Sequence, residues 1–244
     1  MAISASDASG QDSATTPDSE KTFFFVMAIV VAATAIVGFS FARLIGLSSF
    51  GAPWWVHVHA LTMMSWVGLF LAQTGLIWQR QVAAHRRLGH VGAVWIGWML
   101  IVGLLATAWS LGTRRAPPFF DPVFFLAMDW LNIVAFAATA WAGIALRRRT
   151  DWHRRLMLGA TIIVLGPAWG RLMPLPILRE GVVWPISALL LLYFGAGMIY
   201  DLRTRGRIHP AYGVGVAVLA VFVLLIRPLA AIPAFAELAH TITG

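Results

Sequence analysis

Long apolar runs, separated by proline, glycine or charged residues, dominate the chain. They fall at residues 22–46, 54–79, 90–112, 122–147, 155–174, 182–200 and 211–233. Each is close to the length of about 20 apolar residues that one helix needs to cross a bilayer. The pattern therefore predicts an all-α fold, a polytopic membrane helix bundle of about seven transmembrane helices.

The segments outside these runs are short. Residues 1–21 are rich in Ser, Asp, Thr and Ala, which predicts a disordered tail on the cytoplasmic side. Residues 22–233 form one transmembrane domain, and residues 234–244 form a short C-terminal tail. No interval between the apolar runs is long enough for a further domain.

Composition and charge narrow the functional classes. Only 11% of the residues are charged, whereas a soluble domain carries about 25%. The formal net charge is +8, and such an excess in a membrane protein is typical of topology and anionic-lipid contact, so nucleic acid is not an expected partner. The absence of cysteine excludes disulfides, thiolate metal sites and iron–sulfur clusters.

The loops differ in basic residues, which predicts the orientation of the chain. Twelve of the 18 lysines and arginines fall on one side of the predicted bundle: Lys21, Arg80, Arg86, Arg87, Arg147, Arg148, Arg149, Arg154, Arg155, Arg203, Arg205 and Arg207. Because cytoplasmic loops collect Lys and Arg, the N-terminus is expected in the cytoplasm of a cell with an inner (plasma) membrane. With seven spans, the C-terminus is periplasmic.

A short motif repeats where two spans begin. Residues 85–88 and 153–156 both read His-Arg-Arg-Leu, and residues 205–209 resemble a degraded third copy. The repeat predicts one leading helix followed by three hairpins, related by an axis along the membrane normal. The repeated arginines are expected to face anionic lipids on the cytoplasmic side; they are Arg86, Arg87, Arg154 and Arg155.

Ionisable residues inside spans are candidates for function, because burying a charge in hydrocarbon is costly. Asp129 is the one carboxylate placed within a predicted span, and Asn132 lies on the same helical face, three residues on. Arg171, in the fifth span, is the expected partner of Asp129. The pair is either part of a functional site or a buried ion pair that only fixes helix packing.

His57 and His59 are the candidate metal ligands, with His59 also a candidate proton carrier. At about 100° per residue their rings diverge on a helix, so His59 is expected to face inward and His57 to face headgroups or a loop. Met128 and Met173 lie at a similar depth, and thioether with imidazole suits copper or an axial haem position. These methionines alternatively fill gaps in the apolar packing.

Several segments together resemble a group of uncharacterised bacterial multispanning inner-membrane proteins. They are His-Val-His at 57–59, Gln73, His-Arg-Arg-Leu-Gly at 85–89, residues 151–157 and Gly-Pro-Ala at 166–168. That resemblance implies no activity. A looser similarity to membrane b-type cytochromes implies haem held between helices. This chain departs from their paired histidines, which leaves His59 with Met128 or Met173 as axial ligands.

Three functional hypotheses follow. The first is a redox or metal-handling protein in which His59 binds haem or copper, or carries protons, and Asp129 with Arg171 supports it. The second is a proton-coupled transporter of a small solute or ion. The third is a non-catalytic subunit or assembly factor with membrane-protein partners or a second copy of itself.

Overall fold

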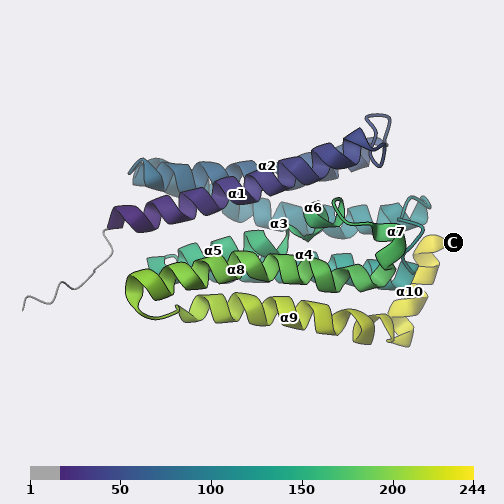
Figure 1. Cartoon of the computed structure of the whole chain (residues 1–244). Helices are drawn as coiled ribbons and strands as arrows, with labels where there is room; N and C mark the ends of the chain where they lie inside the picture. The colour runs from purple at the N-terminus through teal and green to yellow at the C-terminus, as the bar shows by residue number, and fades with distance from the viewer. Residues whose placement is uncertain (1–16) are drawn as a thin grey trace, which may run out of the picture.

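A computed structural model describes residues 17–244, and these form helices joined by short connections (Figure 1). The elements are α1 (Pro17–Leu44), α2 (Trp54–Trp78), α3 (Val82–Gly112), α4 (Pro122–Ala145), α5 (Thr150–Ile163), α6 (Gly166–Gly170), α7 (Leu175–Leu178), the 3-10 turn η1 (Arg179–Val182), α8 (Val183–Arg205), α9 (Pro210–Ala230) and α10 (Pro233–Thr243). The predicted all-α bundle is confirmed.

Six helices are long and apolar enough to cross a membrane: α1, α2, α3, α4, α8 with the turns before it, and α9. The chain is therefore a multi-pass membrane protein by the length and composition of these helices. The predicted fifth span, residues 155–174, is not one continuous helix. It consists of the 14-residue α5, a break, and the five-residue α6.

The segment from α5 to η1 nevertheless runs the length of the bundle. At its start, Asp151 Oδ2 lies 2.9 Å from Nε2 of His209, which precedes α9. At its end, Glu180 Oε2 accepts a hydrogen bond of 3.0 Å from Arg227 near the end of α9. Because α9 alone is long enough to span a membrane, the segment that contacts both of its ends crosses the bundle as well.

Local sequence explains where several helices begin and end. Asp121 caps α4 by accepting from the backbone N–H of Phe124 at 2.9 Å, directly before a proline at the first helical position. His209 caps α9 in the same way, through Nδ1 and the N–H of Ala211. α8 ends at Gly206, whose φ of 67° is the left-handed conformation that glycine adopts readily.

The predicted boundary between the N-terminal tail and the first span is wrong. α1 begins at Pro17, so residues 17–21 of the predicted tail are helical, while residues 1–16 lie outside the described part of the chain. The predicted C-terminal tail is the helix α10, which lies across one end of the bundle (Figure 1). Its Ala239 is fully buried among residues of α3 and α4, including Leu111 and Leu126.

α5 lies at the centre of the bundle, in contact with α1, α4, α8 and α9. Residues 158–163 of this helix are all buried. A close approach holds the next short helix in place, because a Cβ at Gly38 of α1 would collide with the carbonyl oxygen of Ala168 in α6. Small residues allow this backbone contact between membrane helices, so α6 packs closely against α1.

Candidate functional site

The break between α5 and α6 has a chemical cause. Pro167 has no backbone N–H, so the carbonyl of Ile163, four residues earlier, loses its helical hydrogen bond. The side chain of Asn132 on α4 replaces this bond, donating from Nδ2 to the Ile163 carbonyl oxygen at 3.0 Å. An interruption of helical hydrogen bonds within a membrane bundle is tolerated only where such partners satisfy the freed groups. Asn132 therefore supports the broken helix.

Asp129 lies one helical turn before Asn132 on α4. Its Oδ2 accepts a hydrogen bond of 3.3 Å from the hydroxyl of Thr107 on α3. The prediction that Asp129 and Asn132 share a face agrees with these contacts, since both side chains bind neighbouring helices inside the bundle. The carboxylate thus lies beside the broken helix and has a neutral hydroxyl as its hydrogen-bond partner.

Arg171 lies directly after α6. It donates from Nη1 to the carbonyl oxygen of Pro167 at 2.8 Å, and its guanidinium lies 4.1 Å from the centre of the Phe39 ring on α1. It interacts electrostatically with both Asp129 and His59. Among the described residues no salt bridge joins Arg171 to Asp129, so the two expected partners interact as neighbouring charges without a direct ion pair.

The two histidines of α2 have different surroundings. His57 binds the preceding loop, with Nε2 donating toward the carbonyl oxygens of Phe50 and Ala52 at 3.2 and 3.0 Å. His59 places Nδ1 in the interior, where this atom is buried and has no hydrogen-bond partner in the described residues. The prediction that one ring faces a loop and the other faces inward agrees with these contacts.

The predicted metal ligands do not form a larger cluster. Within residues 17–244, no group of three or more His, Asp or Glu side chains is arranged to hold a metal ion. Met128 packs against the buried apolar core beside Phe124 and Ala127, which is the packing role considered for it. Met173 lies in the turn after α6, where its N–H donates to the Gly170 carbonyl at 3.2 Å.

The opposite end of the bundle, called the arginine-rich end, contains residues 80–87, 147–155 and 203–209. Arg155 is fully buried there and donates to both carboxylate oxygens of Asp201 on α8, with a Nε–Oδ2 distance of 3.0 Å. It also donates to Glu20 on α1 at 2.9 Å. The prediction that Arg155 faces lipid is therefore wrong, because its guanidinium is enclosed by two carboxylates.

Asp201 and Glu20 were not identified from the sequence. Asp201 is fully buried, and it also accepts a hydrogen bond of 3.1 Å from the backbone N–H of His209. Both acids lie just outside the predicted apolar runs, where charged residues are usually assigned to water. One signal could have identified them. Arg155 is the first residue of a mostly apolar run, and a buried arginine needs a carboxylate as its partner.

The repeated histidines share a structural role. His153 of α5 donates from Nδ1 to the carbonyl of Gly143 in α4 at 2.8 Å. The side-chain amide of Gln73 on α2 donates a hydrogen bond of 2.6 Å to Nδ1 of His85 on α3, in the amide orientation that gives both its oxygen and its nitrogen a partner. The rings of His85 and His153 lie 6.3 Å apart. Each histidine thus forms a hydrogen bond with the preceding helix. In both cases the two helices are the partners of a predicted hairpin.

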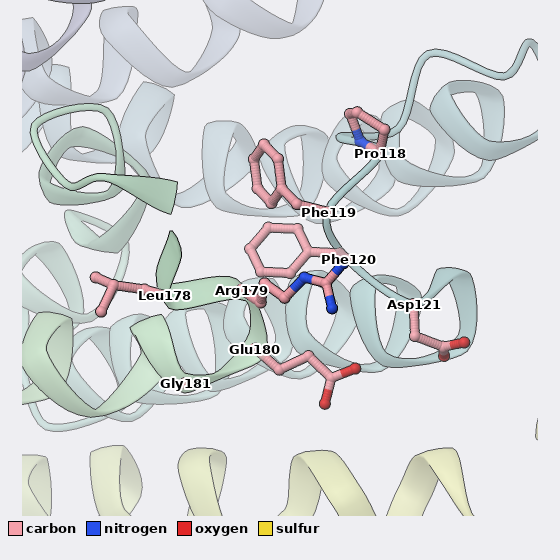
Figure 2. Close-up of a pocket in the computed structure, with 8 residues that line it drawn as sticks. All are labelled: Pro118, Phe119, Phe120, Asp121, Leu178, Arg179, Glu180 and Gly181. Atoms are coloured by element: carbon pink, nitrogen blue, oxygen red, sulfur yellow. The ribbon is translucent and has the colours of Figure 1, made fainter. Parts of the chain in front are cut away.

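A cavity of about 480 Å³ opens at the end of the bundle opposite the arginine-rich end, and Figure 2 shows the residues that line it. The loop before α4 contributes Phe119 and Phe120, while the turn η1 contributes Arg179 and Glu180. Arg179 has a φ of 47°, an unfavourable conformation for a residue with a side chain. Such strain is concentrated at functional positions, which makes the cavity a candidate entrance.

Comparisons with family models, with curated proteins and with solved structures gave no match to this chain.

Proposed function

We propose that the protein is a carrier that moves a small solute across the membrane together with protons, with α5 and α6 as its moving part. The observation that carries this proposal is the discontinuous helix at Pro167, whose freed carbonyl is bound by Asn132. Secondary transporters commonly form their binding sites at such broken helices, near the middle of the membrane.

The charged residues beside the break provide a way to couple proton transfer to solute binding. Asp129 and His59 are ionisable, lie within the bundle, and interact electrostatically with Arg171 without an ion pair to it among the described residues. A proton that arrives at the carboxylate removes its attraction for the guanidinium. Arg171 is then free to bind an anionic group of the solute. Intramembrane carboxylates and histidines serve as proton relays in pumps and transporters.

Access to the break requires one part of the bundle to move against the rest. α6 contacts α1 through the close approach at Gly38, and the cavity beside Arg179 lies at the end of the chain segment that follows α6. In this scheme the solute enters near Arg179, reaches Arg171, and leaves at the arginine-rich end. Opening toward that end requires the Arg155–Asp201 contact to separate or rotate.

Uptake into proteoliposomes tests this proposal. The purified protein is assayed with a panel of radiolabelled small carboxylates, amino acids and inorganic anions, with and without an inward proton gradient. We expect gradient-driven uptake of at least one class, abolished by a protonophore and by Asp129→Asn. Glu237→Gln, which changes an exposed carboxylate on α10, is the matched control and keeps wild-type uptake. Uptake that is unaffected by Asp129→Asn would contradict the assigned role.

A second candidate function rests on the unpartnered Nδ1 of His59. An imidazole nitrogen without a hydrogen-bond partner fits a ligand of copper or haem iron, and bound metal would supply redox chemistry at this position. Absorption spectra of the purified protein, oxidised and reduced, together with elemental analysis, test this alternative. A reducible Soret band or stoichiometric copper that disappears in His59→Ala would favour it over transport.

A further inference from the structure

The arginine-rich end holds buried hydrogen-bond donors that nothing in the described chain satisfies. They are Arg154 Nε on α5, Arg205 Nη1 at the end of α8, and the hydroxyl of Tyr212 on α9. Buried donors without partners are rare in folded proteins, and each one is a reason to look for a missing acceptor. Three helices contribute these donors to the same part of the bundle.

The three side chains are neighbours. Arg154 interacts electrostatically with Arg205 and with Arg155, and Tyr212 interacts with Arg154 and Arg155. The Arg155 guanidinium lies 5.7 Å from the centre of the Tyr212 ring. Tyr212 itself is held rigidly, because its ring fills the space where a Cβ at Gly197 of α8 would lie, 2.5 Å away. Arg154 thus lies near enough to both Arg205 and Tyr212 to interact with them, which places the three donors at the same end of the bundle.

The arginines of this region differ in their acidic partners. Asp201 binds Arg155, and Glu20 binds Arg154 and Arg155 at 2.9 Å each. A third carboxylate, Asp151, interacts electrostatically with Arg154 and is bound to His209. Among the described residues no carboxylate forms a salt bridge with Arg205. An anionic ligand with several acceptor oxygens would satisfy the donors that these carboxylates leave without partners.

We propose that this cluster, at Arg154, Arg205 and Tyr212, binds a phosphate group. Phosphate oxygens accept several charge-assisted hydrogen bonds, and guanidinium groups match their geometry. The Arg154 side chain is 32% exposed, so a ligand can reach the cluster from outside the bundle. Basic pockets between membrane helices bind lipid headgroups, and the same chemistry would hold free phosphate. The argument for this site does not rest on the transport proposed above, although the site lies at the end of the bundle where the solute would leave.

Native mass spectrometry of the full-length protein in detergent tests this site, with phosphatidylglycerol, diacylglycerol and inorganic phosphate as separate probes. We expect one tightly held adduct with phosphatidylglycerol or with phosphate. Its affinity should fall about tenfold or more in Arg205→Gln, because one charge-assisted hydrogen bond is lost. Arg203→Gln, an exposed arginine two residues away on the same helix, is the matched control and should keep wild-type binding.

The outcomes separate the sources of the ligand. An adduct with phosphatidylglycerol but not with phosphate identifies a lipid headgroup, and the reverse identifies a soluble anion. Arg205→Lys keeps the charge but loses the forked geometry, so it provides a well-folded second variant with intermediate affinity. Binding of neither anionic probe, or equal binding by the Arg205→Gln and Arg203→Gln proteins, would overturn the proposal. Equal binding of diacylglycerol, which has no phosphate, would show apolar contact alone and would also overturn it.

Discussion

Replacing Asp201 by asparagine tests the buried network at the arginine-rich end. The carboxylate accepts two hydrogen bonds from Arg155 and one from the backbone N–H of His209. Removing one partner of a buried ion pair costs about 3–5 kcal/mol, because the remaining charge is left uncompensated. Glu20 still compensates Arg155 in part, and asparagine still accepts through one oxygen. We therefore expect Asp201→Asn to lower the free energy of unfolding by about 3 kcal/mol, the lower end of that range.

The assay is reversible unfolding in mixed micelles, followed by the loss of helical circular dichroism as a denaturing detergent is added. Arg203→Gln on the same helix is the control, and a change of less than about 0.5 kcal/mol is expected for this exposed position. In the double variant Arg155→Met with Asp201→Leu, no charge of the pair remains, so much of the stability should return. A loss below about 1 kcal/mol in Asp201→Asn would refute the reasoning about its buried charge.

Three other predictions concern the packing and orientation of the bundle. Gly38→Leu should lower the free energy of unfolding by about 1–3 kcal/mol, because its side chain collides with the α6 backbone, whereas Gly68→Ala, which has open space, should not. Asn132→Leu should cost about 1–3 kcal/mol and speed hydrogen exchange across α5 and α6, since a buried carbonyl loses its partner; unchanged exchange would contradict this. Cysteines introduced singly at Arg148 and Ser49 should react with an impermeant thiol reagent from opposite sides, Arg148→Cys from the cytoplasm, and labelling of both from one side would contradict the predicted topology.

The positions of the long helices along the chain were predicted well, because the length of an apolar run determines where a membrane helix can lie. The run at 54–79 corresponds closely to α2. The repeated His-Arg-Arg-Leu motif predicts hairpins, and its histidines form hydrogen bonds between the two helices of each one. The broken fifth span could not be distinguished from a continuous one by hydropathy, since the residues around the break are apolar. Pro167 was visible, but a proline in a membrane helix produces either a kink or a break, and the neighbouring helices decide which.

The candidate site was predicted in part. Asp129, Asn132, Arg171 and His59 were selected because polar residues inside apolar runs are conspicuous, and they do lie around the break. What the sequence could not reveal was their pairing, because contacts between distant helices depend on packing. For the same reason, Arg155 was assigned to lipid on the basis of its basic neighbours, while its carboxylate partners lie 46 and 135 residues away along the chain.

Cysteine accessibility at the helix break tests the central claim most directly, and the natural chain has no cysteine to interfere. Val164→Cys is placed in oriented vesicles and treated with a membrane-impermeant thiol reagent from each side in turn, with Ala140→Cys in the buried core as the control. An alternating carrier predicts that position 164 is labelled from both sides, whereas position 140 is labelled from neither. If position 164 reacted from neither side, the break would be a fixed part of the packing, and the transport proposal would be contradicted.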